Sequence, residues 1–130
     1  MTVYHVEATE DTPQVILDPG AGIFRIEGNS YPENTSKFYV PVLDWLKEYI
    51  ATAPKKEMAF EFSFDYFNTS SSKYILEILR LIQQYKELGN EVVVKWYFLE
   101  DDTDMQETGE DYQQTIDVKF EIIAKPDEYA

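Results

Sequence analysis

Residues 57–67 carry the most constraining pattern in this chain, because apolar and polar side chains alternate along them. Alternation of this kind places the two sorts of side chain on opposite faces of a β-strand. A strand with one apolar and one polar face belongs to a sheet that is covered on one side and open to water on the other. The apolar face carries Met58, Phe60, Phe62, Phe64 and Tyr66, and the polar face carries Glu57, Glu61, Ser63 and Asp65.

Other alternating segments supply the rest of the predicted sheet. Residues 15–18 and 23–27 form a hairpin around residues 19–22, whose glycines allow the positive φ of a tight turn. Two further strands are expected at residues 92–98 and 116–122. Because each later strand has a polar face, we predict a two-layer α/β fold, with a mixed five-stranded sheet and helices mainly on one face. Opposite charges are expected to pair across the open face, among them Lys95, Asp117, Lys119 and Glu121.

Apolar residues at helical spacing predict two long helices. The first begins near residue 34, and we expect Pro41 to kink its first turn or to separate that turn from the rest. The second contains the apolar residues between Tyr74 and Tyr85. It is expected to stop at Gly89, because glycine suits the left-handed conformation that follows many helices.

Length and charge limit the class of protein. The 130 residues, 44% of them apolar, fit a single domain over residues 1–130, with a loose N-terminus at residues 1–12. The net charge of −14 argues against binding to nucleic acid or to anionic membranes. The chain has no cysteine and no apolar stretch of membrane-spanning length, so we predict a cytoplasmic protein without a thiolate metal site.

A cluster of carboxylates between residues 100 and 111 invites a calcium hypothesis. Asp102 and Asp104 have the spacing that begins an EF-hand loop, but Gly109 comes too late for the sharp turn of that loop. No flanking pair of helices is evident. We therefore predict a solvated acidic loop that holds no metal and that contains, at most, a short helix near residues 104–112.

Four consecutive hydroxyl side chains, at residues 69–72, follow Asn68 where a strand ends and a helix begins. One explanation is that a hydroxyl caps the helix, with Ser70 or Ser71 as the N-cap residue. The other is an anion site, because the first N–H groups of a helix have no acceptor inside it and its dipole favours negative charge. A bound phosphate, or one attached to Thr69, would be stabilised there.

A second loop is expected beside this one. Strand–helix–strand crossovers are right-handed, so the segments that follow strands 23–27 and 57–67 become neighbours at one edge of the sheet. Tyr31 and Pro32 then either form an exposed contact beside the hydroxyls or pack the turn into the first helix. Glu33 and Asn34 either contact a partner or cap that helix.

The sequence gives little support to an enzyme. His5 is the only histidine, and no spacing provides a nucleophile, a base and an orienting group, or a glycine-rich phosphate loop. We therefore predict a protein that is not an enzyme and needs no cofactor. A binding module that senses a small ligand at the same edge, without phosphorylation, remains an alternative.

The two loops resemble the SiaC family of bacterial regulatory phosphoproteins. The likeness is carried by residues 30–34, by Asp44-Trp45 in the following helix and by residues 66–71, and it extends over nearly the whole chain. Members of this family look like distant relatives of STAS-domain anti-sigma-factor antagonists. The resemblance therefore implies a STAS-like fold and a partner-switching role.

The resemblance also implies the partners. In the family, a serine/threonine kinase phosphorylates the threonine of the Asn-Thr-Ser-Ser motif, which is Thr69 here, and a PP2C-type phosphatase removes the phosphate. The unmodified protein binds and activates a diguanylate cyclase, which raises cyclic di-GMP and favours biofilm growth. The residues expected to form the phosphorylated loop and the partner-binding surface are Tyr31, Pro32, Glu33, Asn34, Asn68, Ser70, Ser71 and Lys73.

Overall fold

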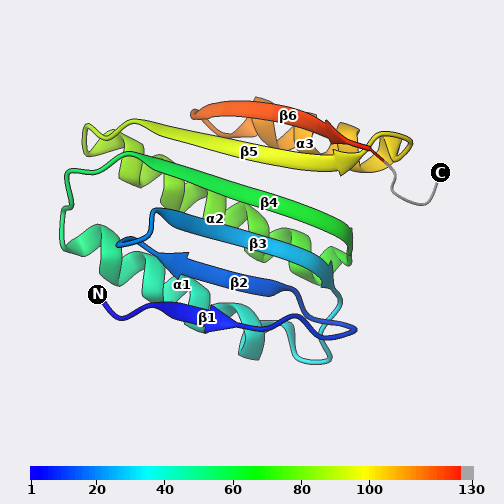
Figure 1. Cartoon of the computed structure of the whole chain (residues 1–130), viewed down its shortest axis with the longest axis horizontal. Coiled ribbons are helices and arrows are strands. Elements are labelled where there is room, and N and C mark those ends of the chain that lie inside the picture. The colour runs from blue at the N-terminus through cyan, green and yellow to red at the C-terminus, as the bar shows by residue number, and fades with distance from the viewer. Residues whose placement is uncertain (127–130) are drawn as a thin grey trace.

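The structure, a computed structural model that describes residues 1–126, has one sheet of six strands and three helices (Figure 1). The α/β class with a mixed sheet is confirmed, but the likeness to STAS domains is not. In chain order the elements are β1 (Tyr4–Val6), β2 (Gln14–Asp18), β3 (Ile23–Ser30), α1 (Thr35–Ala51), β4 (Met58–Phe67), α2 (Thr69–Glu87), β5 (Val92–Leu99), α3 (Thr103–Thr115) and β6 (Lys119–Lys125).

The strands lie side by side in the order of the sequence. Strands β1, β2 and β3 are antiparallel, and β3 to β6 are parallel. Each parallel step is made through one helix, and all three steps advance in the same direction across the sheet. Because such crossovers are right-handed, α1, α2 and α3 all cover the same face (Figure 1). None of the helices in residues 1–126 lies on the opposite face.

The prediction of five strands is wrong by one strand. Tyr4–Val6 forms β1 and pairs with β2, so the expectation of a loose N-terminus fails for these three residues. A strand this short has too few residues to show a period. The segment before it is held as well, because the Trp45 indole nitrogen donates to the carbonyl oxygen of Thr2 at 2.8 Å.

The helices also depart from the prediction. Helix α1 is continuous past Pro41, and α2 begins at Thr69 rather than after an N-cap at Ser70 or Ser71. The acidic segment is mostly the helix α3, so the short helix allowed near residues 104–112 is present and longer, while the prediction of a loop is wrong for most of the segment. Its N-cap is Asp102, whose carboxylate accepts from the Met105 N–H at 3.1 Å. Gly89 has the expected positive φ of 97° just after α2.

Strand β6 spans Lys119–Lys125 rather than residues 116–122. Ile116 and Val118 are buried as the alternation predicts, but they lie in the connection that leads into the strand. A buried connection therefore shows the same alternation as a strand.

The core fills the space between the covered sheet face and the helices. Phe60, Phe62 and Trp96 from the central strands and Tyr39 and Tyr85 from the helices are completely buried. Helix α3 approaches especially closely where Gly109 lies against the Trp96 ring. The indole nitrogen of Trp96 donates to the Met105 carbonyl at 3.0 Å, which fixes α3 on β5.

A bulge interrupts β4 near its end. Gly28 of β3 is opposite Phe64, but the next residue, Asn29, is opposite Tyr66, so Asp65 is an extra residue. One extra residue exchanges the two faces of a strand. Tyr66, predicted on the apolar face, is 53% exposed, and Phe67 turns inward to pack against Trp96.

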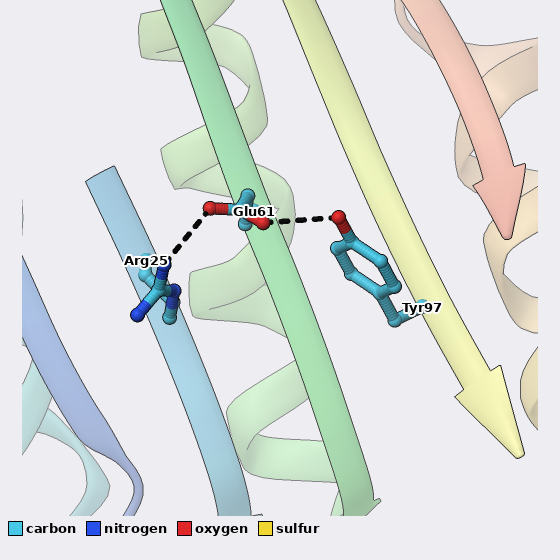
Figure 2. A network of polar contacts seen from close by, with 3 residues as sticks. All are labelled: Arg25, Glu61 and Tyr97. Carbon is cyan, nitrogen blue, oxygen red and sulfur yellow. Dashed lines mark hydrogen bonds and ion pairs between the residues drawn. The ribbon is translucent and has the colours of Figure 1, made fainter. Parts of the chain in front are cut away.

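On the open face, the charges pair differently from the prediction. Among residues 1–126, the ion pairs are His5–Glu7, Arg25–Glu61 and Lys86–Asp117. Arg25 and Glu61 lie on neighbouring strands of the open face, where Tyr97 joins them (Figure 2). Asp117 pairs with a lysine of α2 instead of with a residue across the sheet.

We predict that Gly109→Ala destabilises the protein. Alanine is favoured over glycine in a helix by about 1 kcal/mol, but the added methyl group at residue 109 would lie only 2.6 Å from the Trp96 indole nitrogen. Overpacking of this kind costs about 1–3 kcal/mol. Urea denaturation should show a lower free energy of unfolding, whereas Gly20→Ala, whose methyl group meets its nearest neighbour at 3.6 Å, should change it little. An increase for Gly109→Ala would contradict the packing.

Candidate functional site

The two loops predicted to be neighbours do lie side by side. The Asn68 N–H, at the end of β4, donates to the carbonyl oxygen of Ser30, at the end of β3, at 3.0 Å. The Tyr31 N–H donates to the Asp11 carbonyl at 2.8 Å, which adds the β1–β2 connection to the same edge. The carboxyl ends of β3 and β4 and the start of α2 therefore form one surface.

Asn68 is the N-cap of α2, so the prediction of Ser70 or Ser71 for this role is wrong. Its side-chain oxygen accepts from the Ser71 N–H at 2.9 Å. Thr69 is consequently the first residue of the helix, and its side chain is exposed. The N–H groups of the first helical turn point away from the helix, and no acidic residue occupies that turn. The helix start is thus open to an anion.

A buried chain of hydroxyl groups lies directly beneath Thr69. The Ser30 hydroxyl is 2.6 Å from the Tyr39 hydroxyl and 2.8 Å from the Ser71 hydroxyl. Ser71 also donates to the Ser30 carbonyl at 3.1 Å. All three side chains are completely buried, and burial raises the pKa of Tyr39 to about 12. This chain of hydrogen bonds joins β3, α1 and α2.

Sequence reasoning missed Ser30 and Tyr39 as members of the site. Ser71 is predicted on the partner-binding surface, but its side chain is buried, so it stabilises the fold instead of contacting a partner. The spacing of the hydroxyls could have shown that Thr69 and Ser71 face different sides of the helix. They are two residues apart, and consecutive helical residues are turned by about 100°. Two such residues cannot face the same side of a helix.

An exposed aromatic pair lies at the same edge. Tyr31 and Tyr66 are 39% and 53% exposed, and their ring centres are 6.0 Å apart in an edge-to-face arrangement. The bulge at Asp65 places Tyr66 here. Exposed tyrosines carry a large apolar surface and a polar tip, which makes them frequent anchors in protein interfaces.

The remaining predicted residues fall into two groups. Glu33, Ser70 and Lys73 are exposed around the two loops. Pro32 is buried, which favours its packing role over an exposed contact. Asn34 is the N-cap of α1, and its side-chain oxygen accepts from the Lys37 N–H at 3.1 Å.

Helix α3 is attached to the site through Tyr112. The Tyr112 hydroxyl donates to the Ser72 carbonyl at 2.9 Å, in the first turn of α2. Burial raises the pKa of Tyr112 to about 12, so it remains a donor at neutral pH. The sequence placed Tyr112 within an acidic loop and gave no sign of this contact.

The one histidine of the sequence lies on β1 and has a carboxylate partner. His5 is half exposed and pairs with Glu7 at 2.9 Å, near the N-terminus. Within residues 1–126, no three potential ligands from His, Asp or Glu come together as a metal site requires. None of the described helices has the length and apolar character needed to cross a membrane. The geometry at this edge suits recognition or modification of an exposed hydroxyl.

Comparison with known proteins agrees with this geometry. The sequence model of the SiaC family regulatory phosphoproteins matches residues 6–125. An uncharacterized protein of Pseudomonas aeruginosa strain UCBPP-PA14 is 28% identical over 124 residues, which cover 95% of this chain and 98% of the relative. The chain belongs to the SiaC family.

Solved structures extend the similarity to three dimensions. The crystal structure of apo-SiaC from Pseudomonas aeruginosa superposes with a TM-score of 0.86 at 29% identity, covering 95% of this chain and all of that one. SiaC in the crystal structure of the diguanylate cyclase SiaD with its activator SiaC, from the same organism, gives 0.87 at 28% identity over 94% and 99% of the two chains.

We predict that Ser71→Ala destabilises the protein more than Ser70→Ala does. Removing the Ser71 hydroxyl takes one partner from a buried hydrogen-bonded group, which costs about 1–3 kcal/mol. The exposed Ser70 should change the free energy of unfolding by less than about 0.5 kcal/mol. Urea denaturation of both variants measures the difference. Equal effects would contradict the buried network.

We predict that the protein loses stability between pH 10 and pH 12, in part through Tyr39. A tyrosine in the unfolded chain ionises near pH 10, whereas the pKa of Tyr39 in the folded protein is about 12. Above pH 10 the unfolded state therefore releases a proton that the folded state keeps, and folding becomes less favourable. Tyr39→Phe should flatten the fall by roughly 1.4 kcal/mol per pH unit. Parallel curves of stability against pH for the two proteins would refute this assignment.

Proposed function

We propose that this chain is a regulatory protein, not an enzyme, that switches between partners according to the phosphorylation of Thr69. In its unmodified form it binds and activates a diguanylate cyclase. A serine/threonine kinase adds the phosphate, and a PP2C-type phosphatase removes it. The observation that carries the proposal is the exposed Thr69 side chain at the first position of α2.

The position of Thr69 suits a phosphate. The modified side chain would lie beside N–H groups that have no acceptor within the helix, at the positive end of the helix dipole. Lys73 is exposed and follows four residues later, on the same side of the helix. Its ammonium group provides a cation for the new charge.

The same phosphate would oppose binding of a partner. It adds about −1.5 to −2 charges at pH 7. A partner that packs on Thr69 and on the exposed pair Tyr31 and Tyr66 would have to remove water from that charge. Each 1.4 kcal/mol changes an affinity about tenfold. A desolvation penalty of a few kcal/mol is therefore enough to dissociate the complex.

The cyclase is proposed from the relatives. SiaC of Pseudomonas aeruginosa, which is similar to this chain over nearly its whole length, is an activator of the diguanylate cyclase SiaD. By analogy, this chain acts in the cytoplasm on cyclic di-GMP synthesis and so on biofilm growth. The kinase and the phosphatase are proposed from the Asn68-Thr69-Ser70-Ser71 motif and from the family description as regulatory phosphoproteins.

Binding and activation of the cognate cyclase by Thr69 variants test the proposal. We expect Thr69→Ala to bind as the original protein does and to resist inactivation by the kinase and ATP. Thr69→Asp should bind at least tenfold more weakly, because it places a carboxylate at the helix start. Gln84→Glu is the control, because it adds one negative charge at an exposed residue near the other end of α2, and it should leave binding unchanged.

Two results would overturn the proposal. If kinase-treated protein binds the cyclase as tightly as untreated protein, Thr69 is not a switch. If no kinase modifies the chain while a small molecule changes its affinity for the cyclase, the ligand-sensing alternative is correct.

A further inference from the structure

The open face of the sheet has a cavity of about 190 Å³, on the side away from the helices. It is unrelated to Thr69 and to the α2 start. The side chains that line it come from four neighbouring strands, β3 to β6, and are Arg25, Glu27, Glu61, Ser63, Tyr97 and Lys125. Two of these side chains are acidic and two are basic, so the lining has no net formal charge.

Three of the side chains hold one another in place. Glu61, on the middle strand, accepts from Arg25 with one carboxylate oxygen at 3.3 Å and from the Tyr97 hydroxyl with the other at 3.0 Å. Figure 2 shows the glutamate between its two donors, on three adjacent strands. Burial and the Glu61 carboxylate raise the pKa of Tyr97, which keeps its hydroxyl a donor. These three side chains line one side of the cavity and hold one another in position.

Two of the other three side chains, Glu27 and Lys125, carry charges that form no ion pair within residues 1–126. Ser63 is only 4% exposed, and its hydroxyl oxygen accepts from the Lys125 ammonium. No carboxylate of residues 1–126 lies at ion-pair distance from Lys125 or forms a pair with it. Glu27, directly opposite Ser63 on β3, likewise has no ion-pair partner in that range. An ammonium and a carboxylate thus flank one buried hydroxyl.

We infer that this cavity binds a small zwitterion of the free amino acid class. The ligand carboxylate would contact the Lys125 ammonium and accept a hydrogen bond from the Ser63 hydroxyl, whose oxygen accepts from Lys125. The ligand ammonium would face Glu27. A simple anion is disfavoured by Glu27 and Glu61, and a simple cation by Arg25 and Lys125. The small volume favours a single amino acid over a peptide.

The test is a titration of the full chain with each of the twenty amino acids. Binding is measured from the NMR chemical shifts of the Ser63 and Tyr97 amide groups. At least one amino acid should give saturable shifts. Its analogues that lack either the amino or the carboxyl group should bind at least tenfold more weakly, because each retains only one of the two ionic contacts.

Variants test whether binding depends on the charges that line the cavity or on other charges of the open face. Glu27→Gln and Lys125→Met should each weaken binding at least tenfold. Lys95→Met and Glu121→Gln remove charges on the same face outside the cavity lining and should leave binding unchanged. The dispersion of the NMR signals reports whether each variant is folded.

The inference is overturned if no amino acid gives saturable shifts. It is also overturned if the one-charge analogues bind as tightly as the amino acid, or if Lys95→Met weakens binding as much as Lys125→Met does.

Discussion

The buried hydrogen bonds among Ser30, Tyr39 and Ser71 determine how the candidate site is presented. A polar group without water must keep its partners, so these contacts fix the rotation of the first turn of α2 against β3 and α1. Residues two apart in a helix are turned by about 200° relative to each other. Because Ser71 faces inward, Thr69 faces outward. The exposure of one hydroxyl follows from the burial of another.

The Asp65 bulge has a comparable effect on the neighbouring strand. By adding one residue to β4, it turns Tyr66 toward water and Phe67 toward Trp96. Tyr66 then meets Tyr31, and the two rings form an apolar surface at the edge of the sheet where α2 begins. Two local departures from regular structure, a capped helix start and a bulge, thus bring the features of the site together.

Sequence periodicity predicted the parts of this fold that have long repeats, and missed those that depend on single contacts. The alternation in 57–67 and the apolar spacing of α2 identified the central strand, its covered face and the edge where the loops meet. The three-residue strand β1 has too few residues for a period. In the acidic segment the sequence indicated at most a short helix near residues 104–112, and gave no sign that Asp102 caps it or that Gly109 lets it approach Trp96. For the site, the Asn-Thr-Ser-Ser motif pointed to the start of α2, but only three-dimensional packing shows that Asn68 caps the helix, that Ser71 is buried and that Thr69 is exposed.

Packing leaves Thr69 and Ser70 exposed in this turn and buries Ser71, and we propose that the kinase modifies Thr69. The most direct measurement is mass-spectrometric mapping of the modified peptide after treatment with the cognate kinase and ATP. We expect phosphate on Thr69 and none on Ser71, whose side chain is buried. Phosphate on Ser70 or Ser71, with Thr69 unmodified, would refute the proposed switch.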